Sequence, residues 1–169
     1  MPKKSTVKRA QRDLQQGKSP STASGEFVHE EMEHIREGKH GARSSQQAIA
    51  IGLSKARRAG VPLPPPAKGK VKESTRKSAE REYRKGQAGT ASKPSSKRSR
   101  VREEVLKREP RSVASHRSLS RQSRSASRKR GAPARQSAAA KAVRTKGHSG
   151  LQQAARKAAR TRAAHRNAA

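Results

Sequence analysis

The sequence predicts a mostly disordered chain with α-helices, in which a small all-α helical hairpin near the N-terminus is followed by a cationic, partly helical tail. Three observations support this fold class. Only 28% of the 169 residues are hydrophobic and 1% are aromatic, which is too little apolar material for a large core. The formal net charge of +31 is typical of solvated polycations. Apolar residues at helical spacing, framed by capping residues, are concentrated between residues 20 and 61.

Composition divides the chain into four segments. Residues 1–19 form a basic N-terminal arm, and residues 20–61 form the helical hairpin domain. Residues 62–109 hold a Pro-rich spacer and a charged helical linker, and residues 110–169 form an Ala/Arg/Lys-rich cationic tail. The tail carries sixteen Lys and Arg residues and no Asp or Glu. Such a block cannot neutralise itself, so it stays extended or meets a polyanion.

The first two expected helices precede residue 40. Residues 3–16 predict a short basic helix, which would be marginal alone and ends at Gly17. Residues 26–37 predict a second helix closed by Gly38. Its apolar face consists of Phe27, Val28, Met32 and Ile35, and its opposite face is an acidic stripe of Glu26, Glu30, Glu33 and Glu37.

The third expected helix, residues 44–60, is the best defined. Ser44 and Gln47 form a capping box at its start, and Gly60 followed by Pro62 ends it. At 100° per residue one sector of this helix is apolar, and it consists of Ala48, Ile49, Gly52, Leu53, Ala56 and Ala59. Lys55, Arg57 and Arg58 lie outside that sector, and Ile51 lies on the other side of the helix. Packed on the second helix, it makes a hairpin whose contacts we expect between Phe27, Val28, Met32 and Ile35 on one side and Ile49, Leu53 and Ala56 on the other.

The rest of the chain has almost no apolar face. PLPPPAKGK predicts a polyproline-type spacer, and residues 70–85 predict a solvated helix. A flexible linker is expected over residues 86–99, and a short helix over residues 100–109. In the tail, residues 136–146 and 152–162 match at seven of eleven positions. Alanine favours helix, so this repeat is expected to become helical once phosphates neutralise its cations.

The string QAIAIGLSKARRAGV, preceded by the Glu-rich helix and by GKHGARS, resembles a family of small, highly basic bacterial proteins of unknown function, some loosely labelled plasmid stabilisation. The resemblance covers about residues 17 to 66. It implies a bacterial source and a nucleic-acid connection, and it brings no catalytic residues.

Several function classes are disfavoured. There is no cysteine, no phosphate-binding Gly-rich loop and no nucleophile elbow. His29 and His34 flank HEEMEH, but the metalloprotease signature requires histidines four residues apart and these are five apart. We therefore expect no enzyme, cofactor, metal site or small-molecule substrate.

The N-terminus has no apolar signal region and no segment is long enough for a membrane span. These absences favour a cytoplasmic, nucleoid location without a membrane partner.

The predicted function is non-specific DNA binding and condensation of the nucleoid-associated type, by neutralisation of backbone phosphates. RNA or ribosome association remains an alternative because the chain lacks base-reading aromatics. A plasmid-maintenance interaction module is another alternative, in which the acidic stripe and an exposed Ile51 mediate partner binding or self-association as a homo-oligomer. The expected nucleic-acid-binding residues are Arg43, Lys55, Arg57, Arg58, Arg128, Lys129, Arg130, Lys141, Arg144, Lys157, Arg160 and Arg162.

Overall fold

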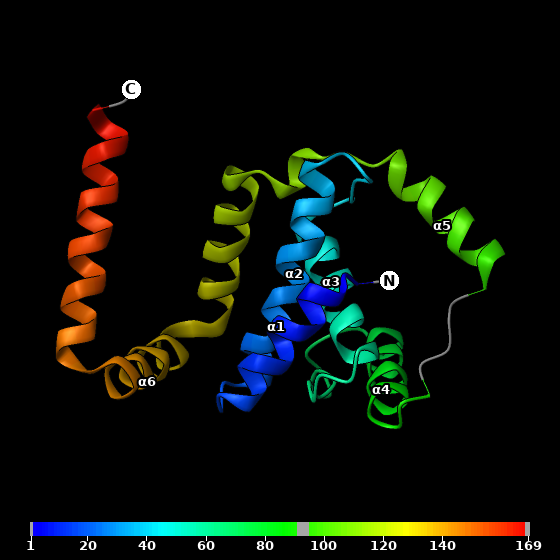
Figure 1. The fold of residues 1–169 in the computed structure, drawn as a ribbon, viewed down its shortest axis with the longest axis horizontal. Helices are drawn as coiled ribbons and strands as arrows, with labels where there is room; N and C mark the ends of the chain where they lie inside the picture. The colour runs from blue at the N-terminus through cyan, green and yellow to red at the C-terminus, as the bar shows by residue number, and fades with distance from the viewer. Residues whose placement is uncertain (1, 91–94, 168–169) are drawn as a thin grey trace. The chain divides into compact units, whose positions relative to one another are not determined.

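The protein is described by a computed structural model that covers residues 2–90 and 95–167 and divides into two compact units, residues 1–122 and residues 123–169 (Figure 1). Helices take up 77% of the chain, and no strand occurs within the covered ranges. The prediction of a mostly disordered chain is therefore wrong. The predicted flexible linker of residues 86–99 includes residues 91–94, which lie outside the described residues.

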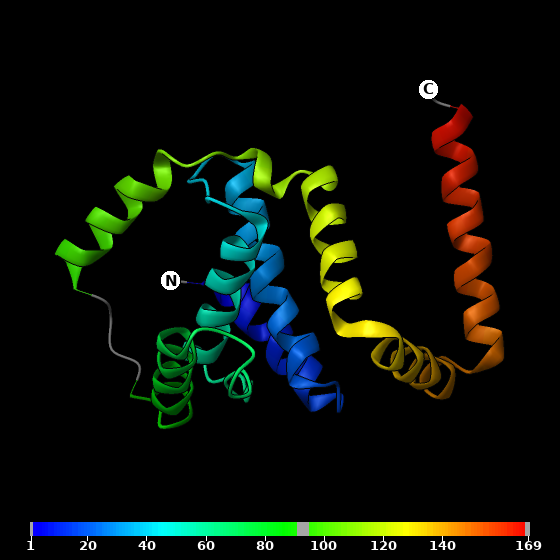
Figure 2. The same cartoon turned by 180° about the vertical axis from the view of Figure 1, so that it is seen from behind.

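Six α-helices and one 3-10 turn are found in the described ranges. The helices are α1 (Lys4–Gln15), α2 (Pro20–Arg36), α3 (Ser45–Arg58), α4 (Glu73–Gln87), α5 (Ser96–Lys107) and α6 (His116–Asn167), and the turn is η1 (Ser112–Ala114). In the first unit α2 is central, since it packs against α1, α3 and η1, while α4 packs on α3 (Figure 2).

The tail is helical because the helix propensity of its residues, and not packing in a core, determines its backbone conformation. Ala, Arg, Lys and Gln are among the strongest helix formers, and a helix of such residues needs no apolar face to form its own hydrogen bonds. Gly131 and Gly147 interrupt α6 with positive φ angles of 77° and 64°, which leaves three straight segments. Low hydrophobicity correctly indicated the lack of a large core but did not exclude helices.

The predicted helix ends near the N-terminus are confirmed. Gly17, Gly38 and Gly60 have φ angles of 71°, 79° and 87°, the left-handed conformation that terminates a helix. Ser44 caps α3 by accepting a hydrogen bond from the Gln47 backbone N–H at 3.2 Å. The Gln47 side chain reaches back to the backbone N–H of Arg43 at 2.7 Å, one residue earlier than an ordinary capping box.

Helix α2 begins six residues before the position expected from the sequence. Pro20 occupies its first turn, where the missing N–H costs nothing. The Ser24 hydroxyl donates to the Pro20 carbonyl oxygen at 2.7 Å, and both Ala23 and Ser24 are fully buried. Tertiary packing therefore overrides the turn propensity of the STASG stretch.

Two apolar clusters hold the first unit together, and each recruits residues from outside the predicted hairpin. One contains Met32, Ile35, Ala42, Ala48, Val113 and Ala114. The other contains Ala10, Ala23, Phe27, Ala56 and Val61. The packed unit is therefore larger than a hairpin of residues 20–61. Leu53 belongs to neither cluster, because the buried stripe of α3 is formed by the smaller residues Ala48, Gly52 and Ala56.

The expected acidic stripe of α2 is only partly solvated. Glu30 is 1% exposed, and its neighbour Glu31 is fully buried. Glu26 forms a salt bridge with Arg9 of α1, so a cation of the N-terminal helix neutralises this member of the stripe. Two buried carboxylates on one helix require partners, and these partners are described below.

The close approach of α2 and α3 depends on Gly52. A Cβ atom at Gly52 would lie 2.7 Å from the Cα atom of Val28, so we expect Gly52→Ala to destabilise the fold by about 1–3 kcal/mol through overpacking. Gly25 of α2 is the matched control, because nothing lies within 4 Å of its Cβ position. Gly25→Ala should stabilise by up to about 1 kcal/mol through helix propensity. Urea unfolding followed by circular dichroism measures both, and equal effects would contradict the helix packing.

Candidate functional site

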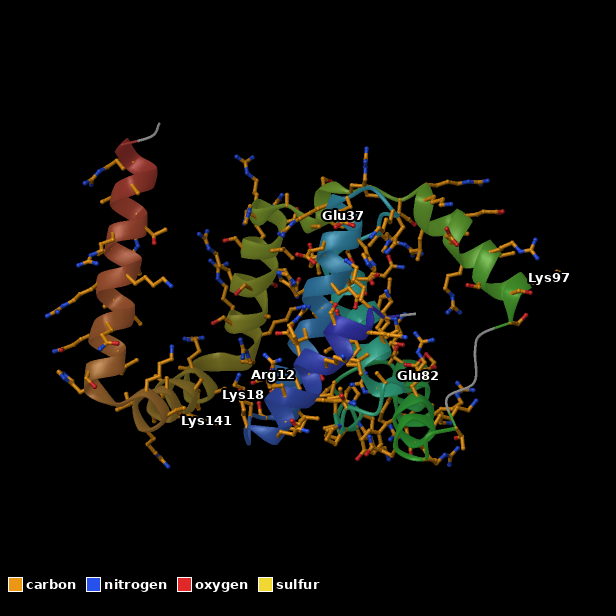
Figure 3. The ribbon with its side chains drawn as sticks, viewed as in Figure 1. Arg12, Lys18, Glu37, Glu82, Lys97 and Lys141 are labelled. Atoms are coloured by element: carbon orange, nitrogen blue, oxygen red, sulfur yellow. The ribbon has the colours of Figure 1, made fainter. Side chains whose placement is uncertain are left out.

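The second unit presents cations without counter-ions. Every Lys and Arg between residues 123 and 166 is exposed, and Figure 3 shows such side chains projecting from the ribbon of α6, with Lys141 labelled. No Asp or Glu occurs in this part of the sequence. Eight of the expected nucleic-acid-binding residues lie here: Arg128, Lys129, Arg130, Lys141, Arg144, Lys157, Arg160 and Arg162.

The internal repeat gives the two C-terminal segments of α6 the same cation pair. Lys141 and Arg144 precede Gly147, and Lys157 and Arg160 occupy the equivalent positions sixteen residues later. Residues three apart on a helix lie on one face, about 5–6 Å apart at Cβ. Each segment therefore offers adjacent cations at a spacing that the helix fixes in advance.

Two of the four expected residues in the first unit have their donors engaged. Arg57 is 7% exposed and donates to the carbonyl oxygens of Leu63 and Pro64 at 3.2 and 3.3 Å. Burial lowers the pKa of its guanidinium. Lys55 Nζ lies 2.5 Å from Glu31 Oε2, with 17% of the side chain exposed. The donors of both side chains are therefore used in contacts within the first unit.

Of the other two expected residues, Arg43 is exposed and Arg58 is half-buried. Arg43 has a side chain that is 79% exposed, and its nearest acid is Glu109, with 3.9 Å between Arg43 Nε and Glu109 Oε1. Arg58 is half-buried at the end of α3. The structure therefore does not bring the four residues together as one free cationic face.

A second feature of the first unit is a buried cluster of carboxylates and imidazoles. His40 Nε2 lies 3.4 Å from Glu31 Oε1, and His34 Nε2 lies 3.6 Å from Glu30 Oε1. Glu30 Oε1 also accepts a hydrogen bond from the Lys3 backbone N–H at 2.8 Å. One oxygen of each carboxylate, Glu30 Oε2 and Glu31 Oε1, is buried without a hydrogen-bond partner among the described residues.

The two imidazoles of the cluster are largely buried, with exposed side-chain fractions of 13% for His34 and 14% for His40. Burial lowers the pKa of His34, and the nearby ammonium groups of Lys55 and Lys39 lower it further. His34 is therefore a neutral imidazole at neutral pH. His29, which the HEEMEH string paired with His34, is 62% exposed and faces Glu33.

The spacing rule for two histidines on one helix does not detect the cluster of Glu31, His34 and His40. Glu31 and His34 are three residues apart, the spacing that puts a carboxylate and an imidazole on one helix face. His40 follows the helix end at Gly38. A Glu-x-x-His pair followed by a histidine just past the helix end was the available signal.

Comparison of the chain with protein-family models, with curated proteins and with solved structures finds no match. These comparisons leave the resemblance over residues 17 to 66 a prediction. In the described ranges, none of the helices has the length and apolar character needed to cross a bilayer.

Proposed function

We propose that the chain binds duplex DNA without sequence preference and condenses it by neutralising backbone phosphates, in a nucleoid-associated role. The residues that do so are the exposed cations of α6, principally the eight named above. Arg43 and Arg58 add minor contacts. Lys55 and Arg57 are left out of this surface, because a salt bridge to Glu31 holds the first and two backbone carbonyls hold the second.

The observation that carries the proposal is a helical segment with only one sign of charge. Thirteen cations lie between residues 123 and 169 and no acid does. A free segment of this kind condenses anions from solution, and DNA carries one negative charge per about 1.7 Å of its axis. Binding therefore releases counter-ions from the DNA, which gives the main favourable term.

Sequence preference is not expected because groups that read bases are missing. Phe27 is fully buried in the core, and Tyr83, the remaining aromatic residue, is half-buried on α4. Stacking on unpaired bases, which RNA recognition commonly uses, therefore has little support. Duplex DNA and folded RNA both present the phosphates that this charge pattern binds, so the titration below compares the two polymers.

A salt titration of the full-length chain on two unrelated duplexes and one structured RNA tests the proposal. We expect equal affinity for the two duplexes and a linear, steep fall of log K with log salt, since each phosphate contact contributes a slope of about −0.9. A salt-insensitive preference for one duplex would contradict phosphate neutralisation. A marked preference for the RNA would favour RNA or ribosome association instead.

A further inference from the structure

Glu31 sits fully buried on α2 with one carboxylate oxygen in contact with a cation and the other without a hydrogen-bond donor. Lys55 Nζ is 2.5 Å from Oε2, whereas Oε1 is buried and has no hydrogen bond. Leaving a buried carboxylate oxygen without a partner is costly, so such atoms are rare in folded proteins. A cation or a hydrogen-bond donor next to Glu31 Oε1 would therefore be stabilising.

One imidazole nitrogen lies near that oxygen, because His40 Nε2 is 3.4 Å from Glu31 Oε1. His40 Nδ1 lies 3.0 Å from the Gly41 carbonyl oxygen, and a carbonyl oxygen only accepts, so Nδ1 carries the ring proton. In the neutral ring Nε2 is then an acceptor, and it lies 3.4 Å from Glu31 Oε1. Two acceptors at this distance repel each other, so the contact is favourable when Nε2 carries a proton or when a metal ion lies between the two atoms.

We propose that Glu31, His34 and His40 bind a divalent transition-metal ion through one carboxylate oxygen and two imidazole nitrogens. Ligand atoms of the three residues all lie within 4.8 Å of one another. Zinc bonds of about 2.0–2.1 Å place two tetrahedral ligands about 3.3 Å apart, and the Glu31 and His40 atoms are already at 3.4 Å. The two imidazole rings meet edge-on, with 79° between their planes.

The donor set selects the class of metal. Two imidazole nitrogens suit zinc and its neighbours in the transition series, whereas magnesium and calcium prefer oxygen donors alone. Three protein ligands leave a fourth position for water. The contact from His40 Nδ1 to the Gly41 carbonyl is the outer-shell hydrogen bond that fixes the tautomer of a metal-binding histidine.

Charge also favours a divalent ion at this place. Glu30 and Glu31 bring two carboxylates into the interior, and the ammonium group of Lys55 offsets one of them. Glu30 Oε2 remains without a hydrogen-bond partner as well. A divalent cation next to Glu31 would supply positive charge at the one oxygen of that carboxylate that Lys55 does not contact.

The fold holds the third ligand in place before the metal arrives. The Gly41 N–H donates to the Leu106 carbonyl oxygen at 2.8 Å, and the Ala42 N–H donates to the Pro110 carbonyl oxygen at 3.2 Å. A Cβ atom at Gly41 would lie 1.9 Å from the Glu109 carbonyl oxygen, so only glycine allows this approach. The end of α5 and the turn after it therefore pin the loop that carries His40.

Zinc binding by the full-length chain, freed of metal with a chelator, tests this inference. The probes are Zn²⁺ in competition with a chromogenic chelator and Co²⁺, whose visible absorption reports tetrahedral coordination. The variants are His34→Gln and His40→Gln, and the matched control is His29→Gln on the same helix. Circular dichroism of each variant verifies that its helices are retained.

We expect one equivalent of Zn²⁺ in the unaltered chain and in His29→Gln, and at least tenfold weaker binding in His34→Gln and in His40→Gln. Zinc should also raise the melting temperature of the unaltered chain and of His29→Gln, because an ion that binds only the folded state stabilises it. Absence of stoichiometric binding would overturn the proposal. So would equal affinity in all three variants.

Discussion

Removal of residues 123–169 is expected to weaken DNA binding by several orders of magnitude at low salt and to flatten its salt dependence. The deletion removes thirteen cations and no acid. A protein that makes 6–10 phosphate contacts loses about 10³–10⁵ in affinity between 50 and 200 mM salt, and we expect the full-length chain to behave in this way. The truncated chain should show a much shallower slope when both are titrated on the same duplex.

The position of the cut keeps the first unit intact. Val113 and Ala114 are buried, and Leu119 packs on the same cluster, so a deletion starting at residue 110 would also damage the core. The truncated chain should therefore keep the circular dichroism and cooperative unfolding of a folded helical unit. An unchanged salt slope in that folded, truncated chain would show that residues 123–169 do not contact DNA.

Replacement of Lys55 by methionine is expected to cost about 3 kcal/mol of folding free energy while leaving DNA affinity nearly unchanged. The ammonium group faces the fully buried Glu31 carboxylate at 2.5 Å, and removing one partner of a buried pair strands the other charge. Methionine has about the same size as the aliphatic part of the lysine side chain, so the packing around residue 55 is conserved. Chemical unfolding and DNA titration of the same sample give the two readouts.

Arg58→Met is the matched control for Lys55→Met, because it removes one cation from the same end of α3 where the side chain is half-buried. Its effect on stability should stay within about 0.5 kcal/mol. Loss of DNA affinity in Lys55→Met without loss of stability would restore Lys55 as a phosphate-binding residue, the role that the sequence suggested for it.

Helix positions were predictable from the sequence wherever a local signal existed. Ser44, Gly38 and Gly60 mark helix ends through capping chemistry that acts over four residues, and the structure confirms all three. The start of α2 at Pro20 was missed, since burial of Ala23 against α1 is a tertiary effect. Composition predicted disorder because it measures the capacity to form a core, and α6 is helical without one.

The sequence pattern places Glu31 and His34 on one helix face, but it does not predict that His40 lies beside them. His40 reaches Glu31 only because Gly41 and Ala42 hydrogen-bond to Leu106 and Pro110, which are more than sixty residues away in the sequence. The burial of Glu30 and Glu31 likewise contradicts the usual preference of carboxylates for the surface. Arg57 looked like a surface cation at the end of an amphipathic helix, and a loop that follows the helix covers it.

The most direct test of DNA binding through α6 compares two full-length variants that each lose five cations to glutamine. One carries Arg156, Lys157, Arg160, Arg162 and Arg166 of α6 as glutamine. The other carries Lys72, Lys77, Arg81, Arg84 and Lys85, which lie in or next to α4 among the acids Glu73, Glu80 and Glu82.

The measurement is the slope of log K against log salt on one duplex for both variants. Binding through α6 predicts a slope that becomes shallower by up to about 4–5 in the α6 variant, since each lost phosphate contact removes about 0.9, and a slope that barely changes in the α4 variant. Equal losses in the two variants would contradict the account, because binding would then follow net charge and not the helix that carries it.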